Sequence, residues 1–393
     1  MKIAVILDGE LQDGSPFPRH GMDWYRLMMP YAGVIGHEVV TVSRSKFDLN
    51  PLDADVYVIN RSRELFRAER IKREGKKLII DVDDYWVLPT WHKMRLENLE
   101  KEYEHGKKHG APQELLTERA QMIAIERNAA DNTIASMRLA DAVTTTNEQL
   151  AERCLKYNKN VHIVRNSIHP QFSQYSLKKQ RSNRLRFGWL GGSFHLRDVA
   201  LMHDGIMKLY RDSEERGRFQ FLSSYGANFE YMEIEKIMTA NYAAVSPEYR
   251  ELLRSNVRVA EHMGLHENYR RLWSVPVHEF GTMYENLDVA LIPLVHGEFN
   301  SCKSELKLVE AGMTGTAAIV SDVLPYSKWL KHGKNCLTTE GTHGWYTAMK
   351  MCLNNPNLVE DIRDGLAELV RKEFNNEDQA KVIENIIESW KSE

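Results

Sequence analysis

Short, continuous apolar segments recur along this chain, and they constrain its fold more than any other feature. The first, KIAVIL at residues 2–7, ends at Asp8 and Gly9. An apolar segment of this length without polar alternation is typical of a strand buried on both faces of a parallel sheet. Similar segments lie at residues 37–42, 55–60, 77–82, 141–146, 161–166, 185–192, 218–226, 255–263, 287–294 and 316–322. Because helical patterns separate most of them, the sequence predicts βαβ units and parallel sheets.

The series of strands and helices restarts in the middle of the chain, which predicts two domains. A polar stretch at 174–184 is interpreted as the linker, because the segment 185–192 begins the second series. The longest predicted helix covers residues 113–139, where apolar residues recur at spacings of three, four and seven. We therefore expect an α/β protein with two doubly wound domains, at residues 1–175 and 183–375. A chain of 393 residues is long enough for two such cores.

Composition and charge argue against several classes of protein. Hydrophobic residues make up 42% of the chain and charged residues 27%, values typical of a folded globular protein. The formal net charge of −3 argues against a strongly basic nucleic-acid binder. The four cysteines, at positions 154, 302, 336 and 352, are too far apart for a disulfide framework or a zinc site, and we expect free thiols. With no apolar stretch of about 18 residues and no signal-peptide pattern, we expect a cytoplasmic protein.

A loop and a helix in the second half carry residues suited to a nucleotide. After the strand at 287–294, SELKLVEAG is interpreted as a helix, with Lys303 and Ser304 at its start and Lys307 one turn later. Glu310 follows Lys303 by seven residues, which places both on one helical face. A helix N-terminus attracts phosphate through its unpaired N–H groups and its dipole, and a carboxylate can accept hydrogen bonds from ribose. The alternative is a surface helix with ordinary charge pairs.

Carboxylates and aromatic residues crowd the end of a predicted buried strand in the first half. Residues 81–86 read DVDDYW. Buried charge is unfavourable unless it is paired or faces a cleft. We therefore expect Asp83 or Asp84 near the acceptor or the reacting carbon, with Trp86 as a platform for a sugar or a base. The alternative is an aspartate that caps the next helix. Gly9, after the first strand, is a candidate for a loop that closes over donor phosphates.

Several segments resemble the donor-binding half of GT-B glycosyltransferases, in particular the large retaining family related to sucrose and glycogen synthases and bacterial polysaccharide transferases. The resemblance rests on VRNSIHPQF (164–172), GWLGGSFHLRD (188–198), SVPVHEFGTMYENLD (274–288), FNSCKSELKLVEAG (299–312) and AAIVSDVLPYSKWLKHGKNCL (317–337). WYRLMMP (24–30) and DVDDYW are similar to segments of some bacterial and phage relatives. The resemblance implies a GT-B fold, two Rossmann-like doubly wound domains facing a central cleft. It further implies an acceptor domain at 1–175, a nucleotide-sugar domain at 183–375, and a helix at 376–393 that packs back on the first domain.

The resemblance also assigns roles to single residues of the second domain. Glu310 matches the second glutamate of the family's Glu–seven residues–Glu motif, which binds the donor ribose. Cys302 stands where the family has the first glutamate. We therefore expect Lys303 and Ser304 to take over from this glutamate by binding the diphosphate.

A glycine-containing turn and an arginine complete the predicted donor site. Gly191, Gly192 and Ser193 resemble the family's loop that approaches phosphate. Arg197 matches the basic residue beside the leaving diphosphate. A cation in that place stabilises the negative charge that cleavage leaves on the β-phosphate. Arg197 and Lys303 are therefore predicted to be catalytic, together with a carboxylate of the DVDDYW segment.

The function that the resemblance implies is transfer of a hexose or pentose from a nucleotide-sugar donor to a hydroxyl group. Retention is expected by analogy, with inversion still open, and no metal or cofactor is expected. Arg26 and His92 join Trp86 as predicted acceptor-binding residues. A glycan or small-molecule acceptor is favoured over a hydroxymethylated pyrimidine in phage DNA, which the basic segments 67–77 and 156–160 would contact through phosphates. A nucleotide-sugar epimerase or a non-catalytic nucleotide-binding protein could be built on the same fold.

Overall fold

The described part of the chain divides into two compact units. The computed structural model describes residues 1–11, 17–50, 52–61, 65–169, 175, 179–212, 214–215, 217–226, 228–240 and 268–392, with the backbone only for 90–95. The predicted strand at 255–263 and the side chain of His92 lie outside the described residues. Unit 1 comprises Met1–His169, Ser301–Ser304 and Asn376–Glu393. Unit 2 comprises Pro170–Asn300 and Glu305–Asn375.

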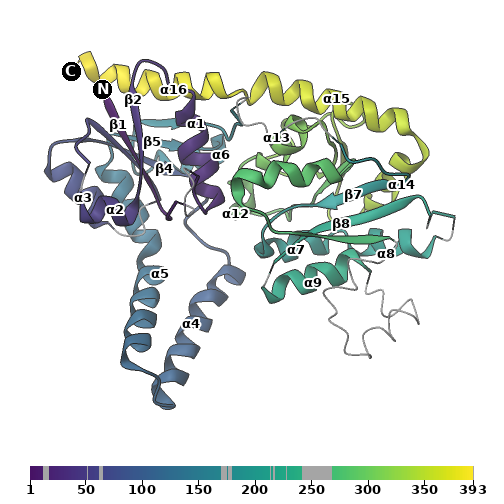
Figure 1. The fold of residues 1–393 in the computed structure, drawn as a ribbon, viewed down its shortest axis with the longest axis horizontal. Helices are drawn as coiled ribbons and strands as arrows, with labels where there is room; N and C mark the ends of the chain where they lie inside the picture. The colour runs from purple at the N-terminus through teal and green to yellow at the C-terminus, as the bar shows by residue number, and fades with distance from the viewer. Residues whose placement is uncertain are drawn as a thin grey trace. The chain divides into compact units, whose positions relative to one another are not determined.

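Unit 1 is built on a six-stranded parallel sheet with the order β2-β1-β3-β4-β5-β6 (Figure 1). The strands are β1 Lys2–Leu7, β2 Glu38–Ser43, β3 Val56–Asn60, β4 Lys77–Val82, β5 Ala142–Thr145 and β6 Val161–Ile163. The helical elements are the π-helical turn η1 Asp23–Met28, α1 Met29–Ala32, α2 Arg44–Leu49, α3 Phe66–Arg73, α4 Thr90–Lys108, α5 Gln113–Leu139, α6 Glu148–Cys154, α16 Asn376–Ser389 and η6 Trp390–Ser392. Ile3 lies in register with Val39 on one side and Val56 on the other.

Apolar side chains cover both faces of this sheet, which explains the absence of polar alternation in the strands. Ile3, Val5 and Leu7 enter one core, and Ala4 and Ile6 enter the other. Successive side chains of a strand point to opposite faces, so a strand between two cores must be apolar throughout. The core of Ile3 also holds the apolar face of α16, formed by Ile383, Ile386 and Ile387.

Helices α4 and α5 connect β4 to β5 and pack along each other as a hairpin (Figure 1). Salt bridges join them at Arg127 and Glu100 (2.6 Å) and at Arg119 and Glu102 (2.8 Å). The bounds of α5 confirm the helix predicted at 113–139. The highly charged stretch before it, residues 96–108, forms the C-terminal part of α4.

Unit 2 has a second six-stranded parallel sheet, with the order β12-β11-β10-β7-β8-β9. The strands are β7 Leu185–Trp189, β8 Phe219–Tyr225, β9 Tyr269–Trp273, β10 Val289–Ile292, β11 Ala317–Ser321 and β12 Leu337–Thr339. The helical elements are η3 Ser193–His195, α7 Leu196–Ala200, α8 His203–Arg211, α9 Phe229–Met238, η5 Val277–Asn286, α12 Glu298–Ser301, α13 Leu306–Met313, α14 Trp345–Asn354 and α15 Pro356–Glu373. The two parallel sheets with flanking helices confirm the predicted fold class.

Three features of unit 2 differ from the prediction. Strand β9 reads YRRLW, and its two arginines argue against a buried strand in the sequence. The strand forms nevertheless, because Glu235 on another element neutralises the buried Arg271. Strand β12 has three residues, too few for a pattern. The predicted helix around Lys307 begins only at Leu306. The placement of Lys303 and Glu310 on one helical face is therefore wrong, since Lys303 precedes the helix and belongs to unit 1.

All four cysteines are buried free thiols. Burial raises the pKa of Cys154, Cys336 and Cys352 to about 12. Because the thiolate is the reactive form, these three side chains act as small apolar groups. The described helices include none that is long and apolar enough to cross a membrane.

Candidate functional site

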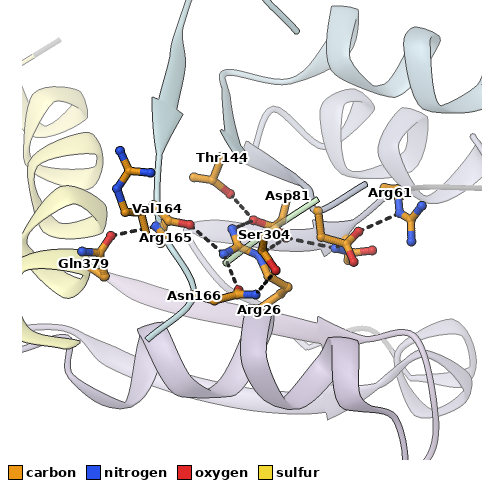
Figure 2. Close-up of polar contacts among 11 residues, drawn as sticks. Arg26, Arg61, Asp81, Thr144, Val164, Arg165, Asn166, Ser304 and Gln379 are labelled. Carbon is orange, nitrogen blue, oxygen red and sulfur yellow. Dashed lines mark hydrogen bonds and ion pairs between the residues drawn. The ribbon is translucent and has the colours of Figure 1, made fainter. Parts of the chain in front are cut away.

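A buried ion pair lies at the carboxyl end of the unit 1 sheet (Figure 2). Arg26 donates from Nη2 to Asp81 Oδ1 (2.6 Å) and from Nε to Asp81 Oδ2 (3.0 Å), and both side chains are 2% exposed. Asp81 also accepts hydrogen bonds from Thr144 Oγ1 (2.7 Å) and Asn60 Nδ2 (3.0 Å). A buried pair is tolerated only when its geometry and its additional hydrogen bonds are good. This pair meets both conditions.

The predicted acceptor-binding residue Arg26 directs its guanidinium into the protein. Besides its two bonds to Asp81, Nη1 donates to the carbonyl oxygen of Val164 (2.6 Å) and to Asn166 Oδ1 (2.9 Å). Arg26 stands in the π-helical turn Asp23–Met28. Such turns are rare and are frequent at functional sites. The contacts join η1 to the ends of β4 and β6.

The carboxylates of Asp83 and Asp84 lie beside two cations. Arg61, the residue after β3, places Nε 2.7 Å from Asp83 Oδ1 and Nη2 3.7 Å from Asp84 Oδ2. Lys303 Nζ is 3.7 Å from Asp84 Oδ1. Burial raises the pKa of Asp83 against the opposing charge of Arg61, and the carboxylates of Asp84 and Asp81 raise it further. A carboxyl group with a raised pKa is suited to general acid–base chemistry.

The predicted platform Trp86 is a core residue of unit 1. Its ring packs edge-on against Tyr85 (5.2 Å between centroids) and Tyr157 (5.7 Å). The indole is buried, which leaves little ring surface for a sugar. Among the described residues, no three His, Cys, Asp or Glu side chains gather as ligands for a metal ion.

The turn after β1 depends on the buried carboxylate of Asp23. This carboxylate accepts hydrogen bonds from the backbone N–H of Asp8 (2.8 Å) and of Gly9 (3.0 Å). A Cβ at Gly9 would lie 2.5 Å from His20 Nδ1, so only glycine fits without a shift. Burial raises the pKa of Asp23. Sequence reasoning missed Asp23, because nothing in the local pattern links it to residues 8 and 9.

In unit 2 the predicted donor residues Gly191 and Lys307 meet at the carboxyl end of β7. Lys307 Nζ donates to the carbonyl oxygen of Leu190 (2.6 Å), and a Cβ at Gly191 would lie 2.6 Å from the same ammonium. The Gly191 N–H donates to Ser224 Oγ (3.0 Å), and its carbonyl accepts from Tyr231 Oη (3.2 Å). A side chain larger than that of glycine at position 191 would therefore clash with the ammonium of Lys307, which lies close to the turn.

The rest of the predicted turn is differently exposed. Gly192 is exposed, and apart from its chain neighbours no atom of the described residues lies within 4 Å of a Cβ placed there. Ser193 is buried, and its Oγ accepts a hydrogen bond from Asn228 Nδ2 (3.4 Å). Arg197 is exposed on α7. The turn thus offers backbone at Gly192 and a guanidinium one turn further along the chain.

Asp198 connects the turn after β7 with the loop after β10. Its Oδ2 lies 2.6 Å from His195 Nδ1, and its Oδ1 accepts hydrogen bonds from the Val295 N–H (2.8 Å) and Asn300 Nδ2 (3.3 Å). Sequence reasoning missed Asp198. The available signal was its spacing from His195, three residues on a helix, which brings two side chains together.

Glu310 is buried on α13 and contacts a tyrosine. Its Oε2 accepts a hydrogen bond from Tyr284 Oη (3.0 Å). Burial and the charge of Glu310 hold the pKa of Tyr284 well above its usual value, so the phenol remains a donor. Glu310 follows Lys307 by three residues, a spacing that places both on one side of α13.

An aromatic edge lies at the carboxyl ends of β8 and β9, formed by Tyr225, Tyr231 and Trp273. Trp273 is 57% exposed and packs edge-on against Tyr225 (5.1 Å between centroids). The Tyr225 ring carries the guanidinium of Arg271 at 3.9 Å from its centroid. Tyr231 reaches the Gly191 carbonyl, so the aromatic edge adjoins the turn after β7.

No protein-family model and no curated protein sequence matches this chain. Its structure is similar to those of solved GT-B glycosyltransferases. Sucrose-phosphate synthase from Thermosynechococcus elongatus is 12% identical, with a TM-score of 0.62 over 100% of this chain and 99% of the other. HepE of Anabaena, solved in complex with UDP, is 13% identical, with a TM-score of 0.56 over 99% and 100%. A UDP-forming trehalose-phosphate synthase from Burkholderia xenovorans is 10% identical, with a TM-score of 0.56 over 88% and 76%.

These likenesses establish the fold. The chain has two parallel sheets with flanking helices, as GT-B enzymes have, and the predicted GT-B architecture of two Rossmann-like domains is confirmed. The roles predicted for single residues remain predictions.

Proposed function

We propose that this chain is a glycosyltransferase that moves a sugar from a nucleotide-sugar donor to a hydroxyl group of a glycan or small molecule. The observation that carries the proposal is the arrangement at the carboxyl edge of the unit 2 sheet. There, Lys307 approaches the backbone at Gly191, and Glu310 lies one turn further along α13. In open parallel sheets, ligands bind at this edge.

A nucleoside diphosphate fits this edge by its chemistry. The backbone at Gly192 and the ammonium of Lys307 suit phosphate oxygens, because a lysine binds phosphate as a compact point charge. Glu310 is an acceptor for ribose hydroxyls. Arg197 is the proposed cation for the charge that grows on the leaving diphosphate. HepE, which has the same fold, is solved with UDP and with UDP-glucose, and this supports uridine sugars as the first donors to test.

The aromatic edge of unit 2 is the proposed contact for the base of the nucleotide. An exposed indole such as that of Trp273 gives a flat apolar surface, and stacking of a base on an aromatic ring contributes about 1–3 kcal/mol. Tyr225, which packs edge-on against Trp273 and carries the guanidinium of Arg271 over its ring, supports the indole. Stacking does not discriminate strongly between bases, so we expect the aromatic edge to raise affinity more than selectivity.

Asp83 is the proposed proton acceptor on the acceptor side. In the transfer, the bond between the anomeric carbon and the diphosphate breaks, a bond from the acceptor oxygen to that carbon forms, and the hydroxyl proton leaves. A carboxylate with a raised pKa accepts that proton more readily than an ordinary aspartate. Arg61, 2.7 Å from Asp83, opposes the effect of burial, because a neighbouring cation favours the ionised form of a carboxyl group.

Thermal unfolding in the presence of UDP-, GDP- and ADP-glucose tests the donor half. At about 100 times its Kd, a ligand adds about 2.7 kcal/mol to the stability of the folded protein. We expect one nucleotide to raise the melting temperature of the wild type and of Glu360→Ala, an exposed glutamate of α15, but not of Glu310→Ala. If no nucleotide sugar stabilises the wild type, the proposal fails. Stabilisation without turnover would indicate a binding protein, and a product formed from the donor alone would indicate an epimerase.

A further inference from the structure

Four residues that run from the last residue of α12 towards α13 belong to unit 1, although the rest of α12 and all of α13 belong to unit 2. This segment, Ser301–Ser304, contains Cys302 and Lys303. Cys302 is fully buried in the same unit 1 core as Val82, the last residue of β4, and Cys154 of α6. A thiol in such a place is a small apolar anchor. A cysteine at the position of the family glutamate is therefore explained by packing, since this side chain lies in an apolar core.

Two buried asparagines of unit 1 hold the next two residues. Asn147 Nδ2 donates to the carbonyl oxygen of Lys303 (2.7 Å), while its Oδ1 caps α6 by accepting from the Leu150 N–H (2.9 Å). Asn166 Nδ2 donates to Ser304 Oγ (2.8 Å). Asn166 is in turn fixed by Arg26, which donates to its Oδ1 (Figure 2). Three successive residues are thus anchored, by a core contact, a backbone hydrogen bond and a side-chain hydrogen bond.

The anchored segment presents Lys303 to the carboxylate pair. The carbonyl oxygen of Lys303 and the side chain of Ser304 are both held by hydrogen bonds. The Nζ atom of Lys303 lies 3.7 Å from Asp84 Oδ1. Charged groups reach the pair from several elements, namely Arg61 after β3, Asp81 on β4 and Arg26 in η1. Lys303 is the contribution of the anchored segment to this group of charges. A cation at that distance favours the ionised form of a carboxyl group.

We propose that Asn147 and Asn166 are positioning residues that fix Lys303 beside Asp84, so that Lys303 acts on the Asp83–Asp84 pair and not on the donor diphosphate. The role differs from the one predicted for Lys303 from the family motif. It rests on the proposed function only in assigning chemistry to the carboxylate pair, since the contacts themselves lie within unit 1. Lys303 and Arg61 both lie beside Asp84, and this division of the cations leaves Asp83 as the group proposed to exchange a proton. Pairs of carboxyl groups divide acid and base roles when their surroundings separate their proton affinities.

Carboxyl carbon NMR titration of the ligand-free protein, labelled at aspartate, tests the proposal. Lys303→Met is expected to raise the titration midpoint of Asp84 by about 1–3 pH units, because the neighbouring cation is lost. Lys303→Arg keeps a cation and is expected to titrate like the wild type. An Asp84 midpoint that does not move in Lys303→Met would overturn the proposal.

Two further variants separate positioning from folding. Asn147→Ser keeps a capping side chain for α6 but is too short to reach the Lys303 carbonyl. Ser304→Ala removes the partner of Asn166 and leaves the bond between Asn166 and Arg26. With a wild-type far-ultraviolet circular dichroism spectrum, each is expected to raise the Asp84 midpoint in the same direction as Lys303→Met. Wild-type midpoints in both variants would show that the asparagines do not position Lys303.

Calorimetric titration with UDP distinguishes this proposal from the proposed function. Lys303→Met is expected to bind UDP with a Kd close to that of the wild type, whereas Lys307→Met binds it at least tenfold more weakly. If Lys303→Met bound UDP as weakly as Lys307→Met, Lys303 would be a donor-binding residue, and the proposal would be overturned. If the wild type binds no UDP, the proposed uridine donor fails, and the NMR titration still decides the role of Lys303.

Discussion

Replacement of Arg26 by Met is expected to destabilise unit 1 strongly, because it leaves the Asp81 carboxylate buried without its cation. Arg26 and Asp81 are both 2% exposed and 2.6 Å apart. After the replacement, the hydrogen bonds that the described residues still donate to the Asp81 carboxylate come from Asn60 and Thr144. Removal of one partner from a buried pair typically costs about 3–5 kcal/mol. At about 2–4 °C per kcal/mol for a unit of this size, the unfolding transition of unit 1 should move down by roughly 6–20 °C.

Thermal unfolding followed by circular dichroism measures this loss, and hydrogen exchange of the β4 amides assigns it to unit 1. Arg127→Met is the matched control, since Arg127 lies the same 2.6 Å from Glu100 but is 61% exposed, and exposed pairs contribute about 0–1 kcal/mol. The double variant Arg26→Met with Asp81→Asn removes both charges and should be more stable than Arg26→Met alone. If the free energy of unfolding of Arg26→Met is within about 1 kcal/mol of that of the control, Arg26 is not a structural cation. Its predicted role in acceptor binding would then be favoured again.

Three further predictions follow from the described contacts. Gly9→Ala should weaken the turn after β1, because its Cβ would lie 2.5 Å from the His20 ring, and stability should fall by about 1–3 kcal/mol in urea unfolding; His20→Ala should restore most of it. Asp83→Asn should lose at least ~100-fold in kcat and the acidic limb of the pH profile, whose midpoint should lie above the usual aspartate value of about 3.9. Since the folded chain holds the Asp83 proton more tightly than the unfolded chain, its contribution to stability falls as pH rises through the raised pKa, and Asp83→Asn should remove that slope. Trp273→Ala should weaken UDP binding by about 1–3 kcal/mol in calorimetry without a change in melting temperature, and unchanged affinity would place the base elsewhere.

The architecture could be predicted because it follows from local patterns. KIAVIL predicts β1 since both faces of the strand are buried, and the apolar spacing over 113–139 predicts α5 to the residue. The pattern fails where a long-range partner changes the meaning of a residue. Arg271 argues against a strand until Glu235 neutralises it. The helix at Lys307 starts late because the preceding residues are held by unit 1.

The proximity of some candidate residues could be predicted for the same reason, while their roles remain predictions. Gly191, Lys307 and Glu310 lie near one another because one turn and one helix carry them. The partners that fix the other candidates are far away in sequence: Asp81 is 55 residues from Arg26, and Asn166 is 138 residues from Ser304. A single sequence holds no signal for such pairs. Trp86 shows the opposite error, since an aromatic residue beside carboxylates suggests a platform, whereas this ring fills a core.

Detection of nucleoside diphosphate released from a nucleotide sugar, by mass spectrometry with an acceptor library, tests the central claim most directly. The wild type is expected to release the diphosphate and to add one sugar mass to an acceptor hydroxyl. Asp83→Asn should bind the same donor, melt no lower than the wild type and form the product at least ~100-fold more slowly. A wild type that binds a nucleotide sugar but leaves it unchanged with every acceptor, or that converts it to an isomer without an acceptor, would contradict the claim that this chain transfers a sugar.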